Sequence, residues 1–280
     1  MEIINGKKTY NILSLGAGVQ SSTLAMMYEK GFLGKKPDCA IFADVGAEPK
    51  KVHEYLDWLT NQISYPVYIV KKGNIFSDFM EEKYRNGYVP FPIFTKDKNG
   101  KIGMGKRQCT SNYKIVPVYE KIREIIGLKT GERAKNILVN QIIGISYDEM
   151  ERMTINQKKW ITNVYPLYEM KITRRKCLEW FRENIGDNLP PRSACTFCPY
   201  HSNEEWKRMK EDDPESFAQA VTVDEFLRSP DRKRTMLNIS EEEFLHRSGV
   251  PLKDVDFRSD IDKGQQVFGF LQECSGMCGL

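Results

Sequence analysis

The first 70 residues alternate strand and helix patterns, and this alternation constrains the fold more than any other feature of the chain. Apolar runs, each about the length of one buried strand, occur at residues 10–14, 39–43 and 67–70. Segments with helical apolar spacing separate them, at about residues 20–31 and 53–63. A β-α-β-α-β order predicts a parallel sheet, right-handed crossovers and a ligand crevice at the carboxyl ends of the strands. We therefore expect an α/β fold with a Rossmann-like parallel sheet flanked by helices.

The rest of the chain continues this pattern and then becomes helical. Asn99-Gly100 predicts a hairpin turn between 92–94 and 102–104, and Pro190-Pro191 predicts an extended linker. The remaining patterns predict a strand at 137–143 and helices at 116–126, 173–184, 203–211, 215–228 and 241–246. We expect a nucleotide-binding α/β domain over residues 1–186. A helical, cysteine-bearing region over residues 187–280 would pack on it.

Composition and charge exclude several classes of protein. A chain of 280 residues with 40% hydrophobic and 11% aromatic residues is not predominantly disordered. Its net charge of +4 neither demands nor excludes a nucleic-acid partner. No window approaches the roughly 18 apolar residues of a membrane span, and the first residues lack a signal-peptide core. These features predict a cytoplasmic protein with no membrane partner.

A loop between the first strand and the first helix has the composition of an anion site. Its glycines let backbone N–H groups approach a phosphate, and the helix N-terminus adds favourable dipole charge. The alternative is a tight strand-to-helix turn without a ligand, because the loop is neither G-x-G-x-x-G nor a Walker motif. The candidate residues are Ser14, Gly16, Ala17, Gly18, Gln20, Ser21 and Ser22.

A second group of candidate residues follows the next strand. Asp44, Gly46 and Glu48 stand where a sugar, a base or a metal ion would lie. The alternative is the ordinary preference of acidic residues for a helix N-terminus.

Seven cysteines in a cytoplasmic chain predict metal or thiol chemistry in place of a disulfide framework. Cys195-Thr-Phe-Cys198 can direct two sulfurs at one ion because two residues separate the thiols. Cys39 and Cys177 occur in apolar contexts, which predicts buried thiols without a ligand role.

The motifs together resemble the PAPS/APS (sulfonucleotide) reductase family of the PP-loop adenine nucleotide alpha-hydrolase superfamily. The segments that carry the resemblance are 14–22, 44–48, 109–117, 165–167, 195–199 and the tail 273–280. Departures occur at Val19 and Gln20, where PP-loop ATP pyrophosphatases have Lys and Asp, and at Ser146, where the family has an arginine. Gln108 precedes Cys109 at the site where the cluster-type reductases have two adjacent cysteines. The tail lacks the family's histidine and has an extra cysteine.

The resemblance implies an adenine nucleotide (PAPS, APS or ATP) bound by the loop, with Gly144 and Arg174 completing the site. It also implies a [4Fe–4S] cluster on Cys109, Cys195 and Cys198, with either Cys274 as the fourth ligand or one iron left open. Zn²⁺ is the rival metal, since thiol spacing alone does not separate the two. Cys278, or Cys274, would be the nucleophile, regenerated by a thioredoxin-like thiol reductant.

Two other functions fit the same residues. The first is an ATP-dependent thiotransferase that modifies tRNA or DNA, for which nucleic acid would be the partner. The second is a non-enzymatic nucleotide-binding zinc module. The sequence leaves the oligomeric state open, a homodimer included.

Overall fold

A mostly parallel sheet organises the N-terminal two thirds of the protein in this computed structural model, which describes residues 2–4, 6–84, 89–129, 131–232 and 241–258. The strand order is β4-β3-β2-β7-β8, and all four pairings along this path are parallel. The strands are β2 (Lys7–Leu15), β3 (Cys39–Asp44), β4 (Val67–Lys71), β7 (Ile137–Ile143) and β8 (Ile161–Val164), and the short β1 (Glu2–Ile4) pairs antiparallel with the start of β2. The α/β class and the parallel sheet that the sequence predicted are confirmed.

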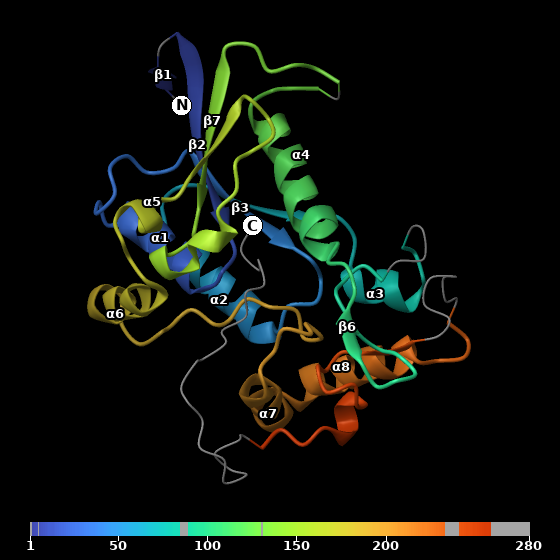
Figure 1. Ribbon diagram of the computed structural model, residues 1–280. Helices are drawn as coiled ribbons and strands as arrows, with labels where there is room; N and C mark the ends of the chain where they lie inside the picture. Colours follow the sequence, from blue (N-terminus) through green and yellow to red (C-terminus); the bar gives the residue numbers. More distant parts are fainter. Residues whose placement is uncertain (1, 5, 85–88, 130, 233–240, 259–280) are drawn as a thin grey trace.

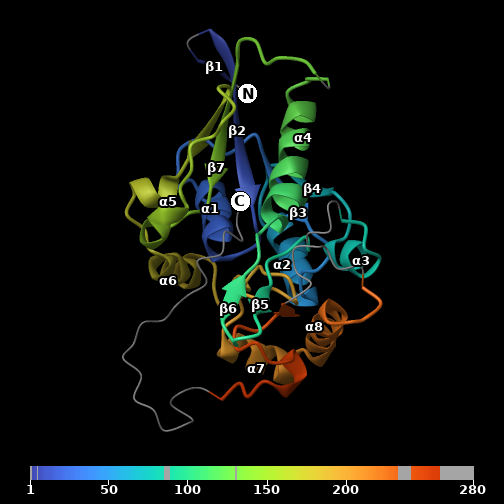
Figure 2. The ribbon, with the colours of Figure 1, turned by 45° about the vertical axis from the view of Figure 1, so that its right-hand side comes forward.

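Helices cover both faces of this sheet (Figure 1; Figure 2). Consecutive residues of β2 alternate between the faces: Leu13 packs with one helical layer, and Ile12 packs with the other. The first layer contains α1 (Val19–Glu29), α2 (Lys50–Thr60) and α6 (Arg174–Asn184), and the second contains α4 (Val116–Ile125). A sheet buried on both faces explains why its strands are continuous apolar runs in the sequence.

A second core, rich in aromatic side chains, lies below the sheet in Figures 1 and 2. Trp206, Phe79 and Phe197 are each at most 1% exposed there. Its elements are α3 (Ile75–Met80), α7 (Asn203–Asp212), α8 (Pro214–Leu227), η4 (Leu252–Asp254) and the three-stranded sheet β6 (Ile102–Met104), β5 (Phe94–Lys96) and β9 (Glu242–Phe244). Because this core combines residues from before and after the linker, the C-terminal region packs on the first region.

Two predictions concern the small three-stranded sheet: the hairpin at Asn99-Gly100 is confirmed, and the helix at residues 241–246 is wrong. The hairpin at Asn99-Gly100 joins β5 to β6 as expected. Residues 241–246, predicted as a helix, instead contain β9, in which Phe244 pairs with Phe94 of β5. Glutamates favour helix locally, but Glu243 is 1% exposed and forms a buried ion pair with Arg232. That tertiary contact, invisible in the local sequence, outweighs the local preference.

Three short elements complete the structure around the upper sheet. They are the π-helix η2 (Thr110–Ile115), the 3₁₀ segment η3 (Tyr147–Arg152) and α5 (Pro166–Glu169). Within the described ranges, no helix combines the length and the apolar composition that crossing a bilayer requires.

Candidate nucleotide and thiol site

The candidate site lies where the strand order of the sheet reverses direction. From β2 the chain proceeds to β3 and β4 on one side, and later returns to β7 and β8 on the other. The loops that follow β2 and β7 therefore meet at the carboxyl edge, where open α/β sheets bind ligands. The contact is close, because a Cβ on Gly144 would lie 2.8 Å from the backbone nitrogen of Ser21. Two of the predicted segments are thus neighbours.

The loop between β2 and α1, residues 16–18, contains the predicted anion site and is called the phosphate loop below. Two hydrogen bonds of the Ser21 hydroxyl hold its shape. Ser21 Oγ accepts from the Gly16 N–H at 3.1 Å and donates to the Gly18 carbonyl at 3.3 Å. Ala17 has φ +53, so the loop turns through a left-handed residue. Gly18 is the N-cap of α1 and has no side chain with which to cap it, which leaves the N-terminal N–H groups and the dipole directed at the loop. This geometry suits an anion, and the Ser21 hydroxyl shapes it.

Two of the other predicted loop residues, Ser14 and Gln20, form side-chain hydrogen bonds with neighbouring elements. Ser14 Oγ accepts from Gln141 Nε2 of β7 at 2.9 Å, and Ser22 is fully buried in the first turn of α1. Gln20, which stands where a PP-loop ATP pyrophosphatase has aspartate, donates to Glu149 Oε2 at 2.7 Å. Ser14 and Gln20 therefore brace the loop, whereas the buried Ser22 Oγ has no hydrogen-bond partner among the described residues.

Residues 146–152 form a polar network with Gln20. The Ser146 hydroxyl, completely buried, donates to Glu149 Oε2 at 3.2 Å. The Arg152 guanidinium pairs with Glu149 Oε1 at 2.5 Å, and its side chain is only 9% exposed. Arg174, at the start of α6, donates its backbone N–H to Asp148 Oδ1 at 3.0 Å. Sequence reasoning missed Glu149 and Arg152, and the signal that could have found them is two opposite charges three residues apart, shortly after Ser146.

The loop after β3 forms the neighbouring wall. Gly46 has φ +76, and a Cβ there would lie 2.7 Å from the Asn74 amide, so only glycine fits. The Gly46 N–H donates to Asp44 Oδ1 at 2.6 Å, and Lys71 Nζ lies 3.0 Å from Asp44 Oδ2. Glu48 is 8% exposed, and burial raises the pKa of its carboxyl, as does Asp44, while Lys114 and His53 oppose the rise.

The cysteine turn contacts both loops. The Cys198 N–H donates to the Cys195 carbonyl at 3.0 Å, which makes a tight turn with both thiols half-buried. The Thr196 N–H donates to the Ala47 carbonyl at 2.8 Å, in the loop after β3. Ser193 lies against the phosphate loop, since a Cβ on Gly18 would be 3.7 Å from the Ser193 Cβ. The predicted CxxC is therefore beside the predicted anion cradle.

The segment that carries Cys109 lies alongside this turn. The Arg107 guanidinium lies over the Tyr200 ring at 5.7 Å from its centroid, and the Tyr200 hydroxyl donates to Met104 Sδ at 3.4 Å. Cys109 and Cys195 both pack against the lower aromatic core. The predicted ligand Cys274 and the predicted nucleophile Cys278 lie outside the described residues.

The two remaining described cysteines are placed as the sequence predicted. Cys39 and Cys177 are buried in the sheet core, and burial raises the pKa of each thiol to about 12. At neutral pH such thiols are protonated and inert.

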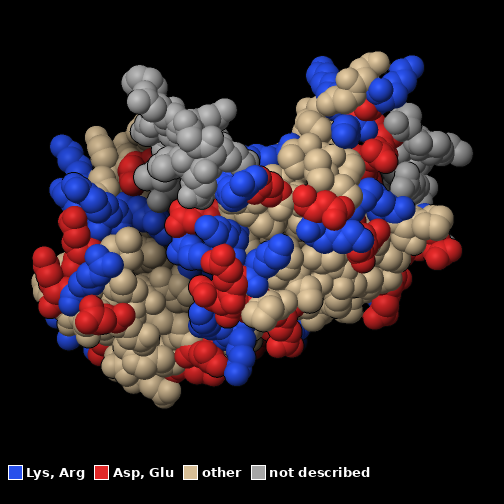
Figure 3. Space-filling model, turned by 90° about the horizontal axis from the view of Figure 1, so that it is seen from below, with Lys and Arg blue, Asp and Glu red and all other residues tan. Residues whose placement is uncertain are grey.

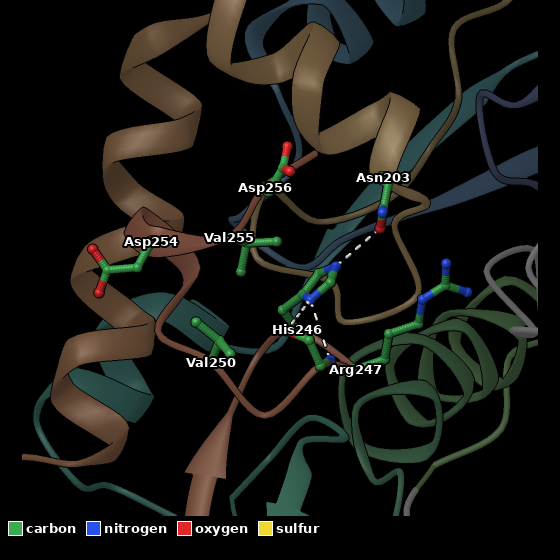
Figure 4. Close-up of a pocket in the computed structure, with 8 residues that line it drawn as sticks. Asn203, His246, Arg247, Val250, Asp254, Val255 and Asp256 are labelled. Carbon is green, nitrogen blue, oxygen red and sulfur yellow. Dashed lines mark hydrogen bonds between the residues drawn. The ribbon is translucent and has the colours of Figure 1, made fainter. Parts of the chain in front are cut away.

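A separate hollow is lined by eight residues: Asn203, His246, Arg247, Ser248, Val250, Asp254, Val255 and Asp256 (Figure 4). His246 Nδ1 accepts the Ser248 N–H at 3.2 Å, so the proton is on Nε2, which faces Asn203 Oδ1 at 3.0 Å. Burial lowers the pKa of this imidazole to about 4, with Arg247 adding to the effect and Asp224 opposing it. This neutral histidine ties β9 to the start of α7, and its hydrogen bonds account for its structural role.

Charges on the face shown in Figure 3 are intermingled, with lysines and arginines next to acidic side chains across the visible surface. Such mixing does not resemble the single-sign stripe with which proteins bind nucleic acid.

Comparisons with known proteins give one kind of match. No protein-family model matches the chain, and no curated protein matches it. Among solved structures, the chain is similar to a phosphoadenylyl-sulfate (PAPS) reductase from Candida auris in a phosphate complex. The two are 11% identical, the match covers 65% of this chain and 75% of that one, and the TM-score is 0.41. That protein bears the name of the family whose motifs the sequence resembles. At this identity and TM-score, the similarity supports no conclusion about substrate or reaction.

Proposed function

We propose that this protein is an adenine-nucleotide-dependent enzyme of sulfur chemistry, and that it reduces a sulfonucleotide such as PAPS or APS. One observation carries the proposal: the segment that contains the Cys195–Cys198 turn contacts the loop after β2 through Ser193 and the loop after β3 through Thr196. Few reactions need thiols beside a phosphate cradle, and transfer of a sulfur-bearing group from a nucleotide is one that does.

The residues that would bind the nucleotide follow from the geometry. The N-terminal N–H groups of α1 bind a phosphate or sulfate. The hydrogen bonds of Ser21 to Gly16 and Gly18 hold the loop in the conformation that leaves these groups accessible. Glu149 and Arg152 orient Gln20 at the same helix terminus. The Asp44–Glu48 loop borders the rest of the nucleotide.

We infer that Cys109, Cys195 and Cys198 would hold a thiolate-bound metal group. Among the described residues, the three sulfurs do not form a group that lies within 4.8 Å of one another, so binding of a single metal ion would have to draw them together. Cys109, Cys195 and Cys198 are half-buried, and an aromatic core lies beneath the first two. Soft thiolate donors in such surroundings suit an iron–sulfur cluster or Zn²⁺. When bound, a [4Fe–4S] cluster would supply positive charge next to the sulfur-bearing group. The backbone hydrogen bond from the Thr196 N–H to the Ala47 carbonyl holds the cysteine turn against the loop after β3.

The chemical step needs a nucleophilic thiolate. The thiolate of Cys278 attacks the sulfonate sulfur, an S–S bond forms, and the S–O bond to the nucleotide phosphate breaks, with the electron pair leaving on the phosphate. The product is a protein S-sulfonate and an adenosine phosphate. A dithiol reductant then supplies two electrons and releases sulfite.

The test is sulfite release from APS or PAPS by the purified full chain with a dithiol donor. We expect release by the wild-type protein, with loss in Cys278→Ser and retention in the buried-thiol control Cys177→Ala. Wild-type protein that binds neither nucleotide, or a Cys278→Ser variant with full activity, would contradict the proposal.

One observation favours a second function, ATP-dependent thiolation of a nucleic acid. The position of the family's substrate arginine is Ser146, whose buried hydroxyl contacts Glu149 in place of a ligand. Pyrophosphate exchange into ATP that requires added tRNA or DNA, in the absence of sulfite release, would select this function.

A further inference from the structure

Three side chains that can bind a metal converge at the loop after β3, and none of them is a cysteine. Asp44 ends β3, Glu48 follows in the loop, and His53 is in the second turn of α2. One ligand atom from each lies within 4.8 Å of the other two. The three thus come from the end of a strand, a short loop and a helix, which fixes their backbones relative to one another.

A second observation, independent of the distances, concerns the Glu48 carboxylate, one oxygen of which lacks a hydrogen-bond donor among the described residues. The side chain is 8% exposed, and its Oε2 is buried with no hydrogen-bond partner among the described residues. A buried carboxylate oxygen without a partner costs free energy that a bound cation would recover. A purely structural acidic residue would instead have this oxygen satisfied by a donor.

The charges around the group define what it binds. Lys71 pairs with Asp44 Oδ2 but is itself 48% exposed, so a divalent ion displaces it at small cost. The Gly46 N–H holds Asp44 Oδ1, which orients the carboxylate and leaves lone pairs for an ion. Burial raises the pKa of the Glu48 carboxyl, and Lys114 opposes that rise.

We propose that Asp44, Glu48 and His53 bind a divalent transition-metal ion. Two carboxylates and one imidazole are a donor set for Mn²⁺, Fe²⁺ or Zn²⁺, harder than the thiolates of the CxxC turn. Three protein ligands leave coordination positions for water or a phosphate oxygen. The ion binds whether or not a nucleotide is present, so the proposal stands apart from the proposed reaction.

The test uses Mn²⁺ as the probe on the full chain after chelator treatment. Free Mn²⁺ is followed by electron paramagnetic resonance, since thiolates compete poorly for this ion. We expect one bound Mn²⁺ per chain, and an affinity at least about tenfold weaker in Glu48→Gln. The neighbouring control Glu54→Gln, an exposed residue of α2, should bind like the wild type.

A second readout separates a metal ligand from a structural carboxylate. Glu48→Gln removes a buried charge, so the metal-free variant should unfold at a temperature no lower than the metal-free wild type. Mn²⁺ should raise the midpoint of the wild type but not of the variant. If Glu48→Gln does not fold, the same measurements are made on His53→Gln. We expect His53→Gln to fold and to bind Mn²⁺ at least about tenfold more weakly than the wild type. A wild-type chain that binds no Mn²⁺ below millimolar concentration, or variants that bind it normally, would overturn the proposal.

Discussion

Gly144 is the residue at which the phosphate loop tolerates least change. A Cβ there would lie 2.8 Å from the Ser21 nitrogen and 3.0 Å from its Cα, and backbone atoms at the start of a packed helix cannot move aside cheaply. We expect Gly144→Ala to lower the free energy of unfolding by about 1–3 kcal/mol. Under the proposed function it should also weaken APS binding, because it displaces the loop that we propose binds phosphate. Urea unfolding and equilibrium titration measure the two effects.

Gly18 provides the matched control in the same loop. A Cβ on Gly18 meets Ser193 at an ordinary contact distance of 3.7 Å, and its φ of −95° suits any residue. Gly18→Ala should therefore change stability by no more than about 0.5 kcal/mol. Equal stability of the two alanine variants would contradict the close contact of the β7 loop with α1.

His246 makes stability depend on pH in a definite direction. Its pKa in the folded protein is lowered from 6.5 to about 4 by burial, so the unfolded chain binds the extra proton more readily. The stabilisation is present above pH 6.5 and is lost as the pH falls towards 4. His246→Gln should reduce the fall in urea midpoint between pH 7 and pH 4.5, and parallel profiles for both proteins would refute this role.

At the scale of elements, Asp224 joins α8 to the segment that follows β9. Its side chain is 1% exposed and accepts the N–H groups of Leu245 and Leu252, each at 2.8 Å, while Arg228 pairs with it at 2.6 Å. Asp224→Asn puts an amide donor against these donors, so we expect a loss of about 3–5 kcal/mol in unfolding free energy.

The adjacent Glu225 tests whether burial causes the effect. It pairs with Lys253, but both side chains are more than half exposed, and Glu225→Gln should cost at most about 1 kcal/mol. Thermal or urea unfolding of the two variants gives the comparison. Similar losses in both would show that the hydrogen bonds to residues 245 and 252 do not hold the elements together.

The elements that the sequence predicted well are those whose signal is local. Apolar runs such as 137–143 predicted strands because a sheet covered on both faces needs them. Asn99-Gly100 predicted its hairpin because few other residues adopt that turn. The strand β8, at the edge of the sheet, has no such run, and β9 was missed because Glu243 is stabilised by Arg232 from outside the segment.

In the candidate site, too, the features with a local sequence signal were predicted, and those that depend on contacts between distant residues were not. Glycine spacing predicted the loop at residues 16–18, and the CxxC spacing predicted a turn with two thiols. The sequence could not predict contacts between residues far apart in the chain. Gln20 donates to Glu149 only because β2 and β7 pair side by side in the sheet. His53 likewise joins Asp44 only once α2 folds back along β3.

At the scale of the whole molecule, the cysteine turn couples the C-terminal region to the nucleotide loops. Residues on either side of Cys195 contact Gly18 and Ala47, so a ligand that orders those loops also orders the turn. We expect APS to slow alkylation of Cys195 and Cys198 in metal-stripped protein, by about threefold or more if the loops open before alkylation.

The buried thiols give the internal reference for that experiment. Cys39 and Cys177 are at most 2% exposed, and with a pKa of about 12 only about one in 10⁴ is a thiolate at pH 8. They should stay unmodified with or without APS, which mass spectrometry of iodoacetamide-treated protein resolves residue by residue. Reaction of Cys39 or Cys177 at the rate of Cys195 would mean that alkylation reports global unfolding. If instead APS binds yet leaves the rates at Cys195 and Cys198 unchanged, the turn and the phosphate loop move independently, and contact between them does not transmit nucleotide binding.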